Sequence, residues 1–387
     1  MLKILWRIII RELKYDSRNP IYWVCLIFFP LLVIFFFTSL MQEGLPTDMP
    51  VGVVDMDNSA VSRKLTRTLD AFQSTEIVAH YPNISEARRA MQRGEVYGFF
   101  FFPRRTTEDL LAQRQPKVSF YYNNSMLLAG SLIYKDMRTA ATLGSASVGQ
   151  AKMAALGKRP QEIKEFLQPI VVDTHATNNP WLSYNIYLST SLIPICISLF
   201  IFLITAYSIG TELKFGRSKE WISLAHGHIR LALTGKMFFQ TFIFSLITWA
   251  YQYYLFIVLG FPHQCSFAAI MFTGLLMVFA SQGFGIFIFG IMPSLRMSMS
   301  VCALWGVLSF SVSGFTFPID AMDGPIQALS WLFPMRSFFM IYQMNVFNGY
   351  PFADSWPYFL TLLVFIFLPV TVVRNIKRAM LTYQYIP

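Results

Sequence analysis

Long apolar segments, interrupted by one large polar segment, constrain this chain most. Six of them reach the ~20 residues that cross the hydrocarbon core of a bilayer: Ile21–Leu40, Ile186–Ile209, Met237–Leu259, Phe267–Ile291, Met297–Phe317 and Ser355–Val373. Only 13% of the 387 residues are charged, and 55% are hydrophobic, whereas a soluble domain has about 25% charged residues. We therefore expect a polytopic α-helical membrane protein with six transmembrane helices.

The basic residues predict the orientation of these helices. Segments 1–20, 210–236, 292–296 and 374–387, which would share one side, contain 14 Lys and Arg residues, whereas the opposite short loops, 260–266 and 318–354, contain only Arg336. Cytoplasmic loops are enriched in Lys and Arg. We expect both termini in the cytoplasm and residues 42–184 outside. The first span, 21–41, is too long for a signal peptide and is expected to stay uncleaved.

The first 20 residues predict an amphipathic helix at the cytoplasmic membrane surface. Basic side chains recur every three or four residues on one face, and apolar side chains recur in the same way on another. The basic set is Lys3, Arg7, Arg11, Lys14 and Arg18, and the apolar set is Leu2, Leu5, Ile9 and Leu13.

The insert, 42–184, predicts alternating strands and helices. Its strand candidates are Val51–Asp55, Ile77–His80, Tyr97–Phe102 and Val118–Tyr122. Helices are expected from Ala60 to Phe72, after Ser85, over Thr107–Gln113 and through most of Ser125–Leu156. This alternation favours an inserted α/β domain, which the predicted orientation makes extracytoplasmic. The insert has no cysteine, so its stability comes from an ordinary core and not from disulfides.

The segment between the fifth and sixth spans is apolar but broken by Gly and Pro. Residues 318–345 are therefore predicted to form two short helices that re-enter the outer leaflet, where protein or a water-filled cavity must cover the backbone.

The net charge of +10 does not indicate nucleic-acid binding. The insert is nearly balanced, with 16 basic and 14 acidic residues, and the excess lies beside the ends of the spans. No basic face comes with an aromatic reading surface.

Motifs for nucleotide or metal chemistry are missing or weak. Thr234-Gly235-Lys236 follows Gly227 by the wrong spacing for a phosphate-binding loop. Asp55-x-Asp57-Asn58 and His226-Gly227-His228 fit a helix cap and a polar turn better than metal sites. The spans as delimited above contain no Asp, Glu, Lys, Arg or His, which disfavours an ion-coupled transporter. We expect no catalytic residue, metal or cofactor bound by this chain.

Several motifs in order resemble one family. They are VGVVDMDNSAVSRKL, GEVYGFFFFP, Asn178-Asn179-Pro180, IGTELKFGRSKEWISLAHGHIRLALTGK, and SGFTFPIDAM with LFPMRSFF. Together they are similar to the membrane subunits of ABC exporters, in particular type-2 permeases with a large extracytoplasmic domain after the first span. The resemblance implies a bacterial inner-membrane half-transporter, a second permease in a homodimer or heterodimer, and separate ATP-binding subunits that hold ATP and Mg.

The resemblance assigns two sites. The cytoplasmic loop 210–236 would dock on the ATPase through a coupling helix, with Gly210, Glu212, Leu213, Lys214, Gly216, Glu220 and Trp221 as its residues. Relatives have Gly-Thr before this helix and Pro after it, where this chain has Arg217-Ser218 and Ala225-His226, which bears on the choice of ATPase partner. The outer gate would comprise Ser313, Gly314, Phe315, Phe317 and Pro318. For the two phenylalanines, plain packing is as good an interpretation as gating.

The sequence thus predicts a permease that exports an amphipathic or lipid-like substrate with energy from a partner ATPase. A periplasmic adaptor and membrane lipid are further expected partners. Two alternatives stay open: an ion-coupled secondary transporter, and a membrane-anchored receptor or assembly factor that transports nothing.

Overall fold

The computed structural model describes residues 2–40, 42–112, 114–168, 175 and 177–383. Its contacts divide the chain into two compact units, one of residues 1–42 and 176–387 and one of residues 43–175. We call them the helical unit and the α/β unit and describe each by itself. Part of the predicted insert, residues 169–174 and 176, lies outside the described residues.

The described part of the helical unit contains six helical segments that are long and apolar enough to cross a membrane, which confirms the predicted fold class. They are Pro20–Leu40 (α2, Pro20–Trp23; η1, Val24–Phe28; α3, Phe29–Leu40), Tyr184–Lys214 (α9), Ile229–Val258 (α11, Ile229–Tyr253; η2, Tyr254–Val258), Phe267–Ile291 (α12), Leu295–Val312 (α13), and Phe352–Thr382 (η5, Phe352–Ser355; α16, Trp356–Phe367; α17, Pro369–Thr382).

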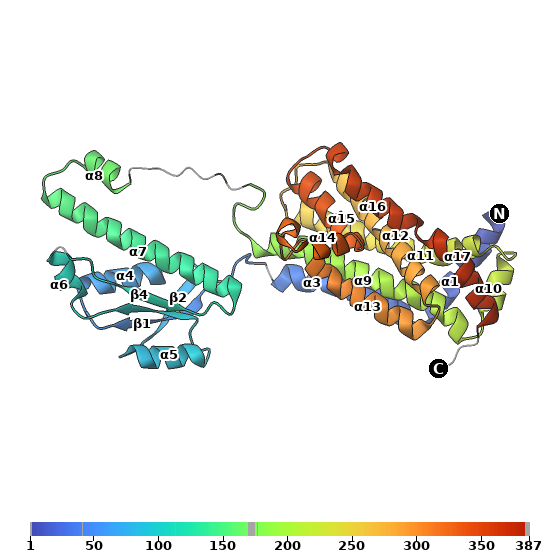
Figure 1. Cartoon of the computed structure of the whole chain (residues 1–387), viewed down its shortest axis with the longest axis horizontal. Coiled ribbons are helices and arrows are strands. Elements are labelled where there is room, and N and C mark those ends of the chain that lie inside the picture. Colours follow the sequence, from blue (N-terminus) through green and yellow to red (C-terminus); the bar gives the residue numbers. More distant parts are fainter. Residues whose placement is uncertain (1, 41, 113, 169–174, 176, 384–387) are drawn as a thin grey trace. The chain divides into compact units, whose positions relative to one another are not determined.

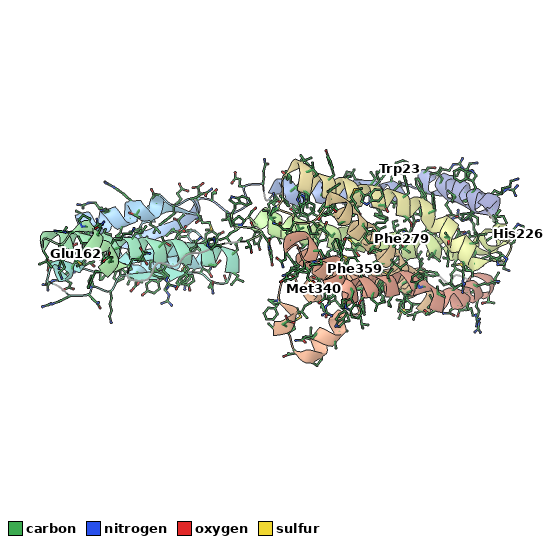
Figure 2. All side chains as sticks on the ribbon, turned by 90° about the horizontal axis from the view of Figure 1, so that it is seen from above. Trp23, Glu162, His226, Phe279, Met340 and Phe359 are labelled. Carbon is green, nitrogen blue, oxygen red and sulfur yellow. The ribbon has the colours of Figure 1, made fainter. Side chains whose placement is uncertain are left out.

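The shorter elements of this unit gather at its two ends. Helices α1 (Leu2–Arg18) and α10 (Ser218–Leu224) lie with α17 at one end, which we call the α10 end (Figure 1). Elements η3 (Ile319–Ala321), α14 (Gly324–Ser330), α15 (Pro334–Ile341) and η4 (Tyr342–Phe347) follow α13, and α14 and α15 lie at the opposite, α15 end. His226 and Met340 mark the two ends in Figure 2.

Helices α9 and α12 form the centre of the helical unit, because 67% and 72% of the residues in an apolar 18-residue stretch of each are buried. They approach closely where Gly285 lies against Thr205, whose Cβ is only 3.0 Å from the position that a Cβ on the glycine would take. Small residues at such crossings allow two membrane helices to pack backbone to backbone.

The last two spans differ from their predicted limits. The fifth ends at Val312 instead of Phe317, because the chain turns at Gly314, whose φ of +89° is a left-handed conformation that favours glycine. The sixth extends beyond Val373 to Thr382 and is broken at Leu368, because Pro369 has no amide hydrogen to continue the ladder of α16. Two short helices, α14 and α15, do form within residues 318–345.

The α/β unit contains one four-stranded sheet of order β2-β1-β3-β4, with the first three strands parallel and β4 antiparallel to β3. The strands are β1 (Met49–Asp55), β2 (Thr75–His80), β3 (Gly98–Phe102) and β4 (Ser119–Tyr122); the helices are α4 (Ala60–Asp70), α5 (Ile84–Gln92), α6 (Thr106–Leu111), α7 (Leu127–Ala155) and α8 (Pro160–Leu167). All four strand predictions are confirmed to within two residues.

Helices cover both faces of this sheet: α4 and α7 lie on one face, and α5 lies on the other (Figure 1). Residues on β1 alternate accordingly, since Val53 packs in the cluster with Leu69 of α4 and Ile133 of α7, whereas Val54 packs with Ala87 of α5. The apolar pattern of the strands reflects a sheet that is buried on both faces.

The acidic residues after β1 stabilise the turn into α4. The side chain of Ser59 caps α4 by accepting from the Ser62 amide at 3.0 Å, and Asp55 accepts from the Ser62 hydroxyl at 2.6 Å. Asp57 accepts hydrogen bonds from the amide and hydroxyl of Thr107, which lower the pKa of its carboxyl. These bonds support the helix-cap interpretation.

Candidate functional site

The end of α9 is fixed by a backbone motif that its sequence encodes. The amide of Gly216 donates to Leu213 O at 3.1 Å, and the amide of Arg217 donates to Glu212 O at 2.9 Å. Gly216 has a φ of +66°. This pair of bonds is the Schellman motif, in which a left-handed glycine ends a helix. It turns the chain into α10, the predicted coupling helix.

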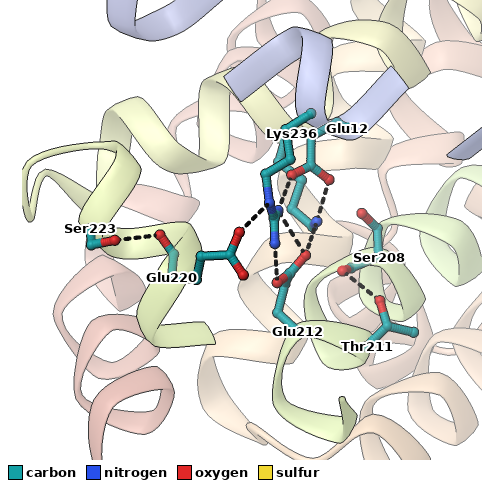
Figure 3. A network of polar contacts seen from close by, with 8 residues as sticks. Glu12, Ser208, Thr211, Glu212, Glu220, Ser223 and Lys236 are labelled. Atoms are coloured by element: carbon teal, nitrogen blue, oxygen red, sulfur yellow. Dashed lines mark hydrogen bonds and ion pairs between the residues drawn. The ribbon is translucent and has the colours of Figure 1, made fainter. Parts of the chain in front are cut away.

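Glu212 lies at the centre of a buried ion-pair cluster and not on the surface (Figure 3). Its two carboxylate oxygens accept from the Arg11 guanidinium at 3.1 and 2.9 Å. Lys236 of α11 donates to Glu212 Oε1 at 2.8 Å and to Glu12 Oε2 at 2.5 Å. Arg11 also pairs with Glu12. We call Arg11, Glu12, Glu212 and Lys236 the charge cluster.

The charge cluster is electrically balanced and sealed from solvent. The side chains of Glu12, Glu212 and Lys236 are at most 2% exposed, and the side chain of Arg11 is 9% exposed. The Lys236 ammonium lies 5.3 Å from the ring centroid of Trp221, which is fully buried on α10. The cluster therefore joins α1, α9 and α11 and has α10 packed on it.

Helix α1 forms over the predicted residues but presents an unexpected face. It turns Ile8, Glu12 and Asp16 inward, while Leu13 is 41% exposed. Ile8 packs on Gly235 of α11, where an added Cβ would lie 2.7 Å from its Cγ2. Of the predicted apolar stripe, Ile9 is also buried and Leu13 is exposed. Ion pairing to α9 and α11 fixes the rotation of α1 about its axis, and the contact of its apolar stripe with a membrane stays a prediction.

A fifth ionisable group, Asp16, is buried beside the charge cluster. Its side chain is hidden from solvent, and burial raises the pKa of its carboxyl to about 7. The ammonium of Lys236 acts against this shift, while Glu12 and Glu212 reinforce it. Asp16 is thus the one of these carboxyls that we expect to change charge near neutral pH.

The predicted coupling residues divide into a buried and an exposed set. Glu212, Leu213 and Trp221 are buried, and Gly210 lies against Leu295 of α13 with no room for a Cβ. The exposed residues between Lys214 and Ser223 are Lys214, Phe215, Gly216, Lys219, Glu220 and Ser223. The Glu220 side chain is 60% exposed and 3.9 Å from Arg11 Nε. A partner at the α10 end would therefore meet Lys214, Gly216 and Glu220 but not Glu212.

The predicted gate residues lie at the α15 end and divide in the same way. Phe315 is 7% exposed and stacks on Tyr187 of α9 with 4.2 Å between ring centroids, and the Tyr187 hydroxyl donates to Phe315 O at 3.1 Å. Ser313 is buried beside it, and Gly314 packs on Ile319. Phe317 is 51% exposed and lies outside this aromatic cluster, and Pro318 is also exposed and precedes η3.

The sequence analysis missed several buried ionisable residues. Arg11 was assigned to the basic face of a helix at the membrane surface, Glu12 and Asp16 were not considered, and Lys236 was weighed only as part of a phosphate loop. Another, Arg336, had been counted only as the lone basic residue of its side. Its position could have identified it, since a single arginine in an apolar segment is often buried or functional.

The helical unit also has an apolar cavity of about 610 Å³ between α11, α12 and the sixth span. Phe238, Phe242 and Phe279 line its wall, and Gln282 supplies an amide whose oxygen accepts from Thr241 at 2.7 Å. Its size is within the range of small-molecule sites.

Comparison with known proteins places this architecture in a family. The chain is 23% identical over 167 residues to the probable multidrug ABC transporter permease YbhR of Escherichia coli K12, and equally to its counterpart in Escherichia coli O157:H7. The match spans 41% of this chain and 43% of the length of these relatives. The model of the family described as "ABC-2 family transporter protein" matches residues 20–373. The chain therefore belongs to the ABC-2 family of transporter proteins.

Proposed function

We propose that this ABC-2 family protein is the permease of an ATP-driven exporter, which moves an amphipathic or lipid-like substrate out of the cytoplasm or the inner leaflet. The observation that carries the proposal is the family match over residues 20–373, which includes all of the six spans except the last nine residues of the sixth. An ABC permease works with an ATP-binding cassette subunit, and we assign ATP hydrolysis to that partner. A second permease, identical or paralogous, completes the transporter.

The proposed docking surface is the exposed part of the loop between α9 and α11. It combines the apolar ring of Phe215, 57% exposed, with the charged side chains of Lys219 and Glu220. An exposed aromatic residue flanked by charges is typical of a protein interface. The charge cluster behind this surface would transmit force from α10 to α1, α9 and α11, because four mutually paired charges resist separation.

Helix α9 connects the two assigned sites directly. Glu212 and Tyr187 are 25 residues apart on it, which corresponds to roughly 37 Å of helix at ~1.5 Å per residue. A displacement at the α10 end would thus reach the Tyr187–Phe315 contact through one element. In this scheme, closure of the ATPase pair separates Phe315 from Tyr187 and opens the exit.

Three features support the remaining assignments. The basic loops support an orientation in a bacterial inner membrane with the α10 end on the cytoplasmic side and the α/β unit outside, where a periplasmic adaptor is a candidate partner. The apolar cavity suits a molecule that is largely hydrophobic. The relatives in Escherichia coli carry a name that refers to multidrug transport, which agrees with amphipathic cargo.

The test is ATP-dependent transport in proteoliposomes that contain this chain and its cognate ATP-binding subunit. We expect Phe215→Ala to weaken co-purification of the two proteins and to lower export at least severalfold. Its thermal stability should stay at the level of the native protein, since the ring is exposed. Glu212→Ala is a poor test, because removing a buried partner destabilises the fold itself.

The matched control is Tyr121→Ala, which truncates an aromatic ring that is 43% exposed in the α/β unit. It should leave co-purification with the ATPase unchanged. Uphill transport by vesicles that lack the ATPase would overturn the proposal in favour of an ion-coupled carrier. Full export by the Phe215 variant would contradict only the proposed docking surface and would leave the exporter function itself in place.

A further inference from the structure

A second cavity lies at the α15 end of the helical unit and is unlike the apolar one. It encloses about 600 Å³ between the beginning of α9, the turn after α13, α15 and η4. Its wall is mixed: Ile186, Phe339 and Met340 are apolar, whereas Asn179 and Gln343 are polar. All of these elements meet where three spans begin or end, which is the depth at which the headgroups of a bilayer lie.

Arg336 of α15 lines this cavity and is nearly inaccessible, with 6% of its surface exposed. Within the described residues, its guanidinium Nε and Nη1 are buried without a hydrogen-bond partner. The guanidinium instead stacks on a π face, since Cζ lies 4.0 Å from the ring centroid of Trp331. Arginine is almost never buried unless it is paired.

Aromatic residues hold the guanidinium in place. Trp331 stacks on Tyr358 of α16, with 5.6 Å between ring centroids and 10° between ring planes, and Tyr358 also lines the cavity. A side chain that is stacked in this way is already oriented before any ligand arrives. Preorganisation of a charged donor is characteristic of a binding site and reduces the entropy that binding costs.

One carboxylate, Asp320, also lines the cavity, but it is exposed and makes no ion pair with Arg336 within 4.0 Å. It does not neutralise the arginine. Burial lowers the pKa of Arg336, and the weak influences of Tyr358 and Asp320 in the opposite direction do not compensate for it. The site therefore has a cation, hydrogen-bond donors and an adjoining apolar wall, but lacks the anion that would balance them.

We propose that this cavity binds the phosphate group of an amphipathic molecule, with the guanidinium of Arg336 as its anchor and the apolar tail against Ile186, Phe339 and Met340. The guanidinium fork matches the oxygens of a phosphate and forms charge-assisted hydrogen bonds to them. The site depends on Arg336 and the cavity, and not on the direction of transport. The phosphate could belong to a membrane lipid or to a free phosphate ester, and binding experiments distinguish these sources.

The experiment measures binding to the full-length protein in a neutral detergent. The probes are dioctanoyl phosphatidylglycerol, dioctanoyl phosphatidylcholine and inorganic phosphate, titrated by calorimetry and counted by native mass spectrometry. We expect saturable binding of phosphatidylglycerol, and binding at least tenfold weaker in Arg336→Met, as befits the loss of a hydrogen bond between two charged groups. Weaker binding of phosphatidylcholine indicates that net negative charge is recognised.

The matched control is Arg296→Met, which removes an exposed arginine in the first turn of α13 and should bind the lipid like the native protein. Binding of inorganic phosphate that depends on Arg336 and matches the affinity of the lipid would support the anion site and make a free phosphate its source. Equal lipid binding by the native protein and Arg336→Met overturns the proposal.

A second variant keeps Arg336 and so avoids any question of folding. Asp320→Asn removes the negative charge that also faces the cavity. It should tighten phosphatidylglycerol binding roughly threefold, the effect of losing a modest repulsion across a partly solvated site. An unchanged or weaker affinity would overturn the placement of the phosphate beside Arg336.

Discussion

Two buried cations in the helical unit differ in how their charge is compensated. Lys236, at the α10 end, is surrounded by the carboxylates of Glu12 and Glu212. Arg336, at the α15 end, has no carboxylate within ion-pair distance among the described residues. Both side chains are nearly free of solvent contact.

The difference indicates that Lys236 stabilises the packing of helices, whereas Arg336 belongs to a binding site. Desolvating a charge costs free energy, which a partner in good geometry offsets. Lys236 and its partners come from three helices, so their pairing fixes how α1, α9 and α11 pack. Arg336 bears the same cost with no partner in place, and a protein tolerates such a cost where a ligand later supplies the missing charge.

The largest expected effect on stability comes from removing Lys236, the cation that has carboxylate partners. Lys236→Met leaves two carboxylates facing a single arginine in a buried cluster, so we expect a loss of about 3–5 kcal/mol in the free energy of unfolding. Thermal or denaturant unfolding in detergent measures it. Adding Glu12→Gln restores the charge balance between Arg11 and Glu212 and should recover much of the loss. Additive effects of the two changes would show that the cluster is not a unit.

The next effect concerns pH at the α10 end. Because the folded-state pKa of Asp16, about 7, is above its ordinary value, the folded protein binds the proton more tightly than the unfolded chain. This contribution to stability is full at acidic pH and is lost as the pH rises towards 7. Each unit of pKa difference corresponds to about 1.4 kcal/mol.

Asp16→Asn tests this prediction, since the amide cannot ionise. The variant should be less sensitive to pH between about 4 and 7 than the native protein, and more stable than it at pH 8. Melting temperatures across this range measure the difference. Identical pH profiles for the two proteins would place Asp16 in a more polar environment than its burial indicates.

A smaller effect on stability is expected at the two glycine turns that follow α9 and α13. Both residues have positive φ, so alanine at either position costs about 1 kcal/mol of strain. Gly216→Ala should cost only that, because no atom lies within 4 Å of the new methyl group. Gly314→Ala should cost more, since its methyl would lie 2.7 Å from Ile319. Unfolding measurements on the pair decide whether the turn after α13 is the tighter one.

The smallest effect on stability is expected from replacing Arg336, the cation without a carboxylate partner. Arg336→Met replaces an uncompensated charge by an apolar side chain of similar length, so the free energy of unfolding should stay within about 1 kcal/mol of the native value or rise. The same unfolding assay, without lipid, measures it. A loss as large as that of Lys236→Met would make Arg336 structural and end the contrast between the two cations.

The membrane spans and the strands could be predicted because they depend on the order of apolar and turn-forming residues within a short stretch of sequence. Six spans follow from apolar length, and the strands of the insert follow from residues such as Val51–Asp55 between turn signals. The end of α9 is equally local, since Gly216 alone permits the left-handed turn. The predicted spans end at Ile209 and begin at Met237 because hydropathy excludes Glu212 and Lys236, whereas helices α9 and α11 continue through these residues.

The amino-acid order by itself thus determined a six-span bundle, an α/β insert and the family resemblance. Only the tertiary structure decided which charges meet, because Arg11 and Glu212 are 201 residues apart and pair through the packing of α1 on the bundle. It also decided that Phe315 is buried while Phe317 is exposed, and that Arg336 faces a cavity without a counterion. A periodic pattern specifies which face of a helix is apolar, whereas the neighbour of a charged side chain is set by contacts between distant segments.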